Sequence, residues 1–543
     1  MCIFANEICR KVQVKHSIIL KGGIVVWVMT ALLCMPINAV ADAYDAKNYM
    51  PVDASVQITE TNLPIVFINT KAIDGNTTII HKDYRVPVRM TIINNADGKN
   101  YGDTLAHPGQ NVDYDGWVGI KYRGKSSFEY AKKKPMGFKT LETSDINGKK
   151  KKVKILGMPK DNDWVLLAPY HDRSMIRDVL TFELARPYFE FTPRSRHCEL
   201  IMDGVYRGIY ILCEKPSKGK NRLNLKTPGD TDDAITGDYM VQLDNDVVEH
   251  YTSKYKARDS MGNNLDYHNL VYYLYEFPKY DDMVPDHSEW LNYINKQISD
   301  FEDVMNSEDY ANPETGYRKY IDVTSFIDNM LVQEFSANPD AYRKSTYLYK
   351  RSDDVCPYFK TCLWDFNLAY GNTLDYLFGN RWHYINIAST QILKQNHVTF
   401  WWARLMEDAY YVDCLKKRWR EYRETNYRDE HISQVIDSLV NLLEVGGARE
   451  RNYKAWPNWN EFIWLCRNNT KNYEDEINYI RSWIENRLSW MDMQLESDEQ
   501  SDYVLSPKKE EYGKWYDLHG RLINGTPMKK GVYIHDGRKV LVR

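Results

Sequence analysis

The sequence predicts an α+β protein in which a strand-rich part precedes a mostly helical part. Over residues 61–245, short apolar blocks and alternating stretches lie between turn-forming residues, a pattern typical of strands. Over residues 288–495, apolar residues recur at three- and four-residue spacings, which is typical of helices. One hairpin pattern interrupts these helices at residues 346–363. The chain has 543 residues, 43% of them apolar, which is enough for more than one compact part.

Two apolar strands and two hairpins are predicted in the strand-rich part. Residues 63–68 form an apolar run, and residues 86–93 alternate over most of their length. Asn-Gly and Asp-Gly pairs readily adopt the left-handed conformations that two-residue hairpin turns need. Such pairs predict one hairpin at Asn147 and Gly148, between 136–141 and 153–156, and another at Asp203 and Gly204, between 199–202 and 205–212.

Helices are expected in both parts. In the strand-rich part, Asp172 is a good N-cap for a helix with one apolar face. In the helical part, the spacing predicts helices over residues 290–305, 323–337, 401–423, 431–443 and 473–495. An acidic linker is expected over residues 496–502, followed by short strands with glycine turns over 503–543.

The N-terminus has the pattern of an export signal. Four basic residues precede a short apolar run over 24–33, and Ala39-Val-Ala41 is a small-x-small cleavage site. We therefore expect a signal peptide over residues 1–41 and an extended leader over 42–60. The apolar run is too short for a typical membrane span, although an uncleaved anchor stays an alternative. The predicted location is periplasmic, cell-surface or extracellular, with no stable membrane span after cleavage.

Charge and cysteine content argue against two classes of protein. The formal net charge is −4, and the predicted signal removes more basic than acidic residues, so the mature chain is more acidic still. This argues against a nucleic-acid partner, and the lysines of residues 149–154 fit the charged edge of an exposed hairpin. Outside the signal, no cysteines are spaced as in zinc sites, so most are expected to be buried apolar residues.

Two aspartates flank the predicted hairpin at residues 346–363. Asp340 lies in Asn338-Pro-Asp-Ala-Tyr-Arg-Lys-Ser345, and Asp365 lies in Trp364-Asp-Phe-Asn-Leu-Ala-Tyr-Gly-Asn372. Because a hairpin returns the chain to where it started, both carboxylates can face one cleft. Phosphoryl transfer needs such a pair, one to take the proton of a hydroxyl and one to hold Mg²⁺ at the phosphates.

The two aspartates also have a plainer interpretation, since Asp and Asn often cap local turns. Their placement around a hairpin, with Phe after the second Asp, favours a catalytic site. In that case Asp365 is the metal ligand, and further oxygens would come from Ser345, Asn367 and Asn372.

Several segments taken together resemble the CotH kinase family, over roughly residues 60–495. In the first half these are Arg123-Gly-Lys-Ser-Ser127, Lys133-Lys-Pro135 and Leu156-Gly-Met-Pro-Lys-Asp-Asn-Asp-Trp-Val-Leu-Leu167. Later in the chain they are Asp203-Gly-Val-Tyr-Arg-Gly-Ile-Tyr-Ile-Leu212 with Glu214, Gln333-Glu-Phe-Ser-Ala-Asn338 with Asp340, and the segment around Asp365.

The resemblance implies a two-lobed, atypical, secreted or spore-coat protein kinase. Its strand-rich N-lobe would span about 61–245 and its C-lobe about 288–495, with Asp340 and Asp365 as the two essential aspartates. The implied reaction transfers the γ-phosphate of ATP, with Mg²⁺ or Mn²⁺, to Ser or Thr of a protein acceptor. The chain has neither the His-Arg-Asp triplet nor the GxGxxG loop of ordinary protein kinases.

A nucleotide pocket is expected where the Arg-Gly-Lys-Ser-Ser segment lies. Arg123, Gly124, Ser126 and Ser127 could hold phosphate oxygens through a guanidinium, backbone N–H groups and hydroxyls. A plain turn at a strand end is the alternative.

One lysine should neutralise the phosphates, with Glu214 as its ion-pair partner. Lys134 is preferred because the next residue is a proline that fixes the local geometry, and Lys139, within a strand, is the alternative. Glu334, on the helix before Asp340, is expected to be structural.

Residues 503–543 resemble the C-terminal sorting segments of a bacterial outer-membrane secretion route. The machinery of that route would then be a partner, and a small surface appendage is the alternative. Two other functions stay open for the whole chain. One is a catalytically silent adhesion or assembly module, and the other is a kinase that modifies a glycan or a small metabolite.

Overall fold

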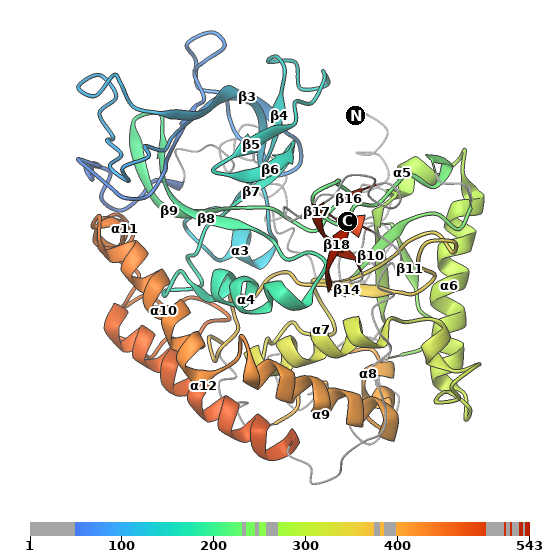
Figure 1. Cartoon of the computed structure of the whole chain (residues 1–543). Coiled ribbons are helices and arrows are strands. Elements are labelled where there is room, and N and C mark those ends of the chain that lie inside the picture. Colours follow the sequence, from blue (N-terminus) through green and yellow to red (C-terminus); the bar gives the residue numbers. More distant parts are fainter. Residues whose placement is uncertain are drawn as a thin grey trace, which may run out of the picture. The chain divides into compact units, whose positions relative to one another are not determined.

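The computed structural model describes residues 49–230, 235–244, 249–256, 270–373, 381–384 and 398–495, and four short strands between 515 and 542. It confirms a mixed α+β protein, with strands concentrated before the main set of helices (Figure 1). The predicted signal peptide and the linker at 496–502 lie outside the described residues. Within the described part of the chain, no helix is long and apolar enough to cross a membrane.

The strand-rich part closes into a seven-stranded barrel, which the alternation of apolar residues alone did not indicate. Its strand order is β1-β2-β3-β4-β7-β9-β8, with β1 and β8 parallel and the other pairs antiparallel. The strands are β1 (Ile65–Asn69), β2 (Val86–Ile93), β3 (Val112–Tyr122), β4 (Met136–Leu141), β7 (Asp163–Leu167), β8 (Ser195–Met202) and β9 (Val205–Cys213).

Only one of the two predicted hairpins forms as expected. Asp203 and Gly204 join β8 to β9, both with positive φ, as a tight hairpin turn requires. After the Asn147-Gly148 turn, in contrast, the chain meets β4 only at the bridge between Leu141 and Lys150. The following strand, β5 (Val153–Ile155), instead pairs with β6 (Met158–Asp161). The reason is that β3 and β7 already occupy both edges of β4.

A second sheet forms the core of the helical part. Its order is β11-β12-β10-β13-β14, and the predicted hairpin is its β13–β14 pair. The strand β10 was expected to end the strand-rich part but pairs with β13, so the strand-rich part ends before it rather than near residue 245. The strands are β10 (Tyr239–Asp244), β11 (His250–Thr252), β12 (Tyr272–Phe277), β13 (Thr346–Lys350) and β14 (Lys360–Cys362).

The longer helices follow the predicted spacing with three differences, and the four-residue helices α3 and α5 were not predicted either. The predicted helix 401–423 is two helices, because the Asp408 side chain caps a new start by accepting from the Tyr410 N–H. The helix expected from Asp172 begins at Arg177, and α11 was not predicted. The helices are α3 (Ser126–Glu129), α4 (Arg177–Ala185), α5 (Tyr280–Met283), α6 (Ser288–Asn306), α7 (Val323–Ser336), α8 (Trp401–Leu405), α9 (Ala409–Glu424), α10 (Asp429–Glu444), α11 (Ala448–Ala455) and α12 (Tyr473–Leu495).

One apolar core joins the barrel to the helical part. Ile209 and Ile211 of β9, Leu180 of α4 and Phe335 of α7 are all buried in it. Figure 1 shows α4 between the barrel strands and α7. The barrel, α4 and α7 are therefore packed as one body, and loops at their junction are held in fixed positions.

The cysteines and the C-terminal strands complete the fold. All six cysteines after the predicted signal are free, and all but Cys356 are buried, as expected for apolar packing residues. The C-terminal strands form a four-stranded sheet with the order β16-β15-β17-β18. They are β15 (Trp515–Tyr516), β16 (Leu522–Ile523), β17 (Gly531–His535) and β18 (Arg538–Val542).

Candidate active site

Two loops at the ends of the β13–β14 hairpin bring Asp340 and Asp365 together. Helix α7 ends at Ala337 in a left-handed conformation, and its loop leads into β13. The strand β14 returns antiparallel to β13 and ends just before Trp364. Asn338 links the loops, because its amide donates to the Asp365 carbonyl (3.0 Å) and its Oδ1 accepts from the Asp340 N–H (3.2 Å). The predicted juxtaposition of the two aspartates is therefore present.

Both loops hold an unusual amount of backbone strain. Five non-glycine residues have positive φ, namely Ala337, Tyr342, Ser345, Asp365 and Tyr370. A non-glycine residue in the left-handed region costs about 1–3 kcal/mol, and such residues persist only where their surroundings fix them. Strained residues cluster at active sites and ligand clamps, so the two loops are the candidate functional site.

The Asp365 carboxylate lies in a buried, acidic environment. Burial raises its pKa to about 6, with a further contribution from the nearby Asp340, and Arg123 partly offsets the increase. Asp244, at the end of β10, raises this pKa further. The Ser345 hydroxyl donates to Asp365 Oδ2 (3.3 Å), and the Asn367 amide donates to Oδ1. Few donors compensate this charge, so a cation at Asp365 would be strongly favoured.

A further aspartate, which the sequence did not reveal, supports the backbone after Asp365. Asp178, on α4, is buried, and its Oδ1 accepts from the Phe366 N–H at 2.6 Å. Burial raises its pKa to about 8, and the neighbouring Asp365 contributes. Nothing in the sequence marks Asp178, because an acidic residue in the first turn of a helix is common.

Asp340 is placed differently from Asp365. Its side chain is 21% exposed, and the buried Arg343 guanidinium donates to its Oδ1 at 2.9 Å. One carboxylate oxygen is thus oriented by Arg343, while the group as a whole stays accessible. This suits a residue that meets an incoming hydroxyl.

The predicted metal ligands are divided by the structure. Ser345 and Asn367 contact the Asp365 carboxylate, whereas the Asn372 amide donates to the backbone carbonyls of His171 (2.9 Å) and Asn367 (2.8 Å). Asn372 therefore fixes the loop. The described residues contain no group of three or more His, Cys, Asp or Glu suited to a metal. One carboxylate with a hydroxyl and an amide still fits Mg²⁺, which binds through few protein groups and takes oxygens from phosphates.

Arg123 is the predicted phosphate-binding residue that the structure places at this site. Its guanidinium lies 5.2 Å from the ring centre of Trp364, next to Asp365. Among the described residues it has no hydrogen-bond or ion-pair partner for its side chain. Gly124 has φ +85°, and a Cβ there would lie 2.1 Å from Ser127 Oγ, so the turn requires glycine. Ser126 and Ser127 follow as the start of the short helix α3.

The structure gives the two candidate lysines different surroundings. Lys134 Nζ donates to the Phe128 carbonyl and lies under the Tyr49 ring, and burial lowers its pKa to about 8. Lys139 instead projects from β4 and lies 3.9 Å from Asp163. Lys134, preferred because of its proline, is thus held among the Phe128 carbonyl and two aromatic rings, whereas Lys139 pairs with a carboxylate.

The expected ion pair between Glu214 and a lysine is absent from the described contacts. Glu214 is buried and accepts a bidentate pair from Arg194 (2.6 and 2.9 Å), with Arg222 at 3.7 Å. The prediction failed because Arg194 and Arg222, on either side of Glu214 in the sequence, contact its carboxylate instead. Glu334 is structural, as predicted: it is buried, pairs with Arg487 and accepts from the backbone N–H groups of His383 and Tyr384.

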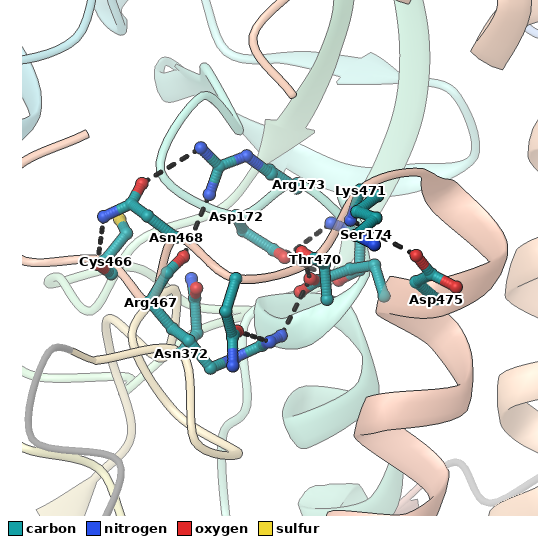
Figure 2. Close-up of polar contacts among 12 residues, drawn as sticks. Asp172, Arg173, Ser174, Asn372, Cys466, Arg467, Asn468, Thr470, Lys471 and Asp475 are labelled. Carbon is teal, nitrogen blue, oxygen red and sulfur yellow. Dashed lines mark hydrogen bonds and ion pairs between the residues drawn. The ribbon is translucent and has the colours of Figure 1, made fainter. Parts of the chain in front are cut away.

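A buried charge network supports the second loop from behind. Arg177 Nη1 lies 2.6 Å from Asp172 and 2.7 Å from Glu476, and its Nε donates to the Ala369 carbonyl (2.9 Å). Arg467 pairs with Glu476 at 2.9 Å. Figure 2 shows Asp172 facing the segment that carries Arg467. This network ties α4 and α12 to the loop after Asp365.

A family model described as CotH kinase protein matches residues 120–491, which is more than half of the chain. The matched region includes Arg123, Asp340 and Asp365. No curated protein matches the chain.

Proposed function

The chain belongs to the CotH kinase family, and from this premise we propose that it transfers the γ-phosphate of ATP to a Ser or Thr hydroxyl of a protein. One observation carries the proposal. The guanidinium of Arg123, without a partner for its side chain among the described residues, lies over the Trp364 ring and acts electrostatically on Asp365, which Asp340 also influences. A cation for phosphate near carboxylates for a metal and a proton is the arrangement that phosphoryl transfer requires.

The proposed step balances as an in-line displacement. The acceptor oxygen forms a bond to the γ-phosphorus, the bond from that phosphorus to the β–γ bridging oxygen breaks, and ADP leaves. Asp340 accepts the hydroxyl proton, with Arg343 orienting its carboxylate. Arg123 stabilises the charge on the transferred phosphoryl group.

Asp365 would hold Mg²⁺, with Ser345 and Asn367 as neighbouring oxygen donors. Bound there, the metal would neutralise phosphate charge. The strained backbone at Asp365 fixes the direction of its carboxylate, and Asp178 maintains that backbone through the Phe366 N–H. Orientation of this kind costs no reorganisation during the reaction.

In this proposal the barrel serves as the N-lobe of a kinase-like fold and the helical part as the C-lobe. Arg123 follows β3 of the barrel, while Asp340 and Asp365 flank the hairpin of the second sheet. The site thus takes groups from both parts, as expected if nucleotide binds between them. We further propose that the protein acts outside the cytoplasm and that residues 503–543 direct it to a secretion machinery.

Transfer from labelled ATP tests the proposal. The purified chain is incubated with γ-labelled ATP and Mg²⁺ or Mn²⁺, alone and with an extract of exported proteins. We expect label on Ser or Thr, of the chain itself or of another protein, that is stable to hydroxylamine. Nucleotide binding without any transfer would instead support a silent adhesion or assembly module, and label on a glycan or metabolite would change the acceptor class.

A further inference from the structure

The short helix α3 directly follows the turn at Arg123 and Gly124, and nothing within the helix itself explains its stability. It has four residues, no hydrogen bond from a capping side chain at its N-terminus, and no buried residue. An isolated helix of this length is unstable in water, because forming the first turn costs more than one turn of hydrogen bonds returns. Contacts from other segments therefore hold α3 in place, and with it the turn that carries Arg123.

Aromatic and cationic side chains surround the ring of Phe128, which lies on α3. The rings of Tyr49 and Tyr122 lie 6.1 and 5.6 Å from it, and Lys82 Nζ and Lys134 Nζ lie 5.0 and 4.8 Å from its centre. Tyr49 also contacts Tyr122 edge-on at 5.4 Å, and its own ring centre is 4.7 Å from Lys134 Nζ. Edge-on aromatic pairs and cations near ring faces are both favourable. We call these five side chains the Phe128 cage.

Hydrogen bonds to the backbone join the Phe128 cage to the turn. Lys82 Nζ donates to the Gly124 carbonyl, and Lys134 Nζ donates to the Phe128 carbonyl. The two lysines of the cage thus fix the backbone at both ends of the segment from Gly124 to Phe128. Since Arg123 directly precedes Gly124, a displacement of the cage would move the backbone that carries its guanidinium.

Tyr49 comes from the segment that the sequence predicted only as an extended leader. The structure anchors this segment on both sides of the cage contact. The Tyr49 carbonyl accepts from Arg207 Nη1 (3.0 Å), the Val52 N–H donates to the Ala455 carbonyl (2.9 Å), and Val56 is buried. The leader is therefore part of the folded body, and its position determines where the Tyr49 ring lies.

We propose that Tyr49 is a positioning residue for phosphoryl transfer: its ring holds Phe128, and through α3 it keeps the Arg123 guanidinium over Trp364, beside Asp365. The inference rests on the proposed function for the reaction that Arg123 serves. The family model begins at residue 120, so this role falls to a residue outside the matched region.

Amide hydrogen exchange tests the positioning without requiring turnover. It is measured on the full chain for the wild type, Tyr49→Ala and Tyr49→Phe. Val52→Ala is the matched control, because it changes a side chain of the same segment that is 69% exposed. Exchange over residues 123–130 should be about 10-fold faster in Tyr49→Ala, as expected when aromatic contacts are lost, and unchanged in α4 and α7.

The two other variants show whether the ring is responsible. Tyr49→Phe keeps the ring and Val52→Ala keeps the whole cage, so both should exchange like the wild type. Equal exchange over residues 123–130 in the wild type and Tyr49→Ala would overturn the proposal. Equally faster exchange in α4 and α7 would also overturn it, because Tyr49 would then stabilise the fold as a whole.

A double-mutant cycle tests whether Tyr49 acts through Arg123. Single-turnover transfer is measured at saturating ATP for Tyr49→Ala, Arg123→Met and the combined variant. Tyr49→Ala alone should lower the rate by about 10- to 100-fold, since a small misplacement of a catalytic group can cost about 100-fold. In the Arg123→Met background the same change should cost less than about 2-fold, because the group that Tyr49 positions is gone. Rate losses that simply multiply would overturn the proposal.

The two measurements separate this inference from the proposed function. If Tyr49→Ala loosens residues 123–130 alone and the wild type transfers no phosphate, Tyr49 positions the turn and the kinase activity fails. If the wild type transfers phosphate and Tyr49→Ala does so at the full rate, the activity stands and the role of Tyr49 fails.

Discussion

Two groups of cationic side chains contact the loop after β14 from opposite ends, and they differ in how their charge is balanced. Behind the loop, Arg177 and Arg467 face Asp172 and Glu476, so every charge has a buried counterpart. At its start, Arg123 lies over Trp364 with no partner for its side chain in the described part of the chain.

A group of cations around Asp163, on the barrel, extends this imbalance beyond the loop. In the described part of the chain Asp163 pairs with Arg85, Lys139 and Lys215, and Glu276 also acts on Lys215, so the cations outnumber the carboxylates there. A balanced, buried network gains nothing from a ligand and serves to hold the fold, whereas an unbalanced and accessible one is stabilised by an incoming anion. The comparison therefore separates structural charges from ligand-binding charges by their partners rather than by residue type.

The largest effect on transfer is expected at Asp365, which begins the loop that both groups of cations contact. Asp365→Asn removes the charge that would hold the metal, so transfer should fall by about 10³-fold or more, equivalent to about 4 kcal/mol.

Asp340→Asn should lower the rate by about 10²- to 10⁴-fold and leave MgATP affinity near that of the wild type. Single-turnover transfer and calorimetric MgATP binding measure the two effects.

Although Asp365→Asn should lower the rate of transfer, it should raise the free energy of unfolding at neutral pH. The folded pKa of Asp365, about 6, lies above its usual value, so the ionised carboxylate destabilises the fold at neutral pH. This penalty is absent at pH 4 and grows as the pH rises through about 6. The Asn variant should therefore gain stability relative to the wild type between pH 4 and pH 7. A full-rate Asp365→Asn variant would contradict the assignment of Asp365.

Arg177→Met should break the balanced network. The change leaves Asp172 without its ion pair and Glu476 with Arg467 alone, and removes the donor to the Ala369 carbonyl. Removal of one partner from a buried ion pair costs about 3–5 kcal/mol. Urea denaturation should show a loss of this size, whereas Arg420→Met, at an exposed arginine of α9, should change the free energy of unfolding by less than about 0.5 kcal/mol.

Replacement of Arg123 by Met should instead weaken ligand binding and leave the stability of the fold nearly unchanged. Arg123→Met removes a cation whose only described side-chain contact of note is the Trp364 ring, so the loss of stability should not exceed about 1 kcal/mol. MgATP affinity should fall by about 10- to 100-fold, because a charged donor to phosphate is lost. Parallel denaturation and binding curves for the Arg123, Arg177 and Arg420 variants test the comparison. Equal stability losses at Arg123 and Arg177 would refute it.

The sequence was most informative where function depends on local chain geometry. Asp340 and Asp365 were placed together because a hairpin must return the chain, and helix α12 has the bounds that its apolar spacing predicted. The role of Asp178 depended instead on a contact with Phe366, 188 residues away, and the partners of Glu214 depended on how the chain folds around its carboxylate. Closure of the barrel was likewise unpredictable, since the parallel pairing of β1 with β8 leaves no mark in the alternation of either strand.

The two lysines before β4 illustrate the same limit. Lys134, which was considered for phosphate, and its neighbour Lys133 are both buried, and neither joins the cations that pair with Asp163. Lys139, five residues after Lys134, does so because of its register with Asp163. Which side of a sheet a side chain occupies follows from pairing, and pairing is a property of the whole fold.

Lys133 is a third kind of cation, buried but without a carboxylate partner among the described residues, and it gives the smallest predicted effect. Its Nζ donates to the Ile209 carbonyl (2.9 Å) and to Asn452 Oδ1 (3.0 Å), which are neutral acceptors, and burial lowers its pKa to about 7. Because the unfolded lysine keeps its proton up to about pH 10.4, the unfolded state binds more protons between pH 7 and that value. The stability that this group contributes should therefore rise with pH across that window, by at most about 1.4 kcal/mol per pH unit.

Urea denaturation at pH 7, 8 and 9 tests this expectation. The difference in free energy of unfolding between the wild type and Lys133→Met should shift in favour of the wild type as the pH rises, while Lys152→Met, at an exposed lysine, shows no such trend. A constant difference across that range would mean that Lys133 stays charged when buried, and that a buried cation can do without an anion when neutral acceptors surround it.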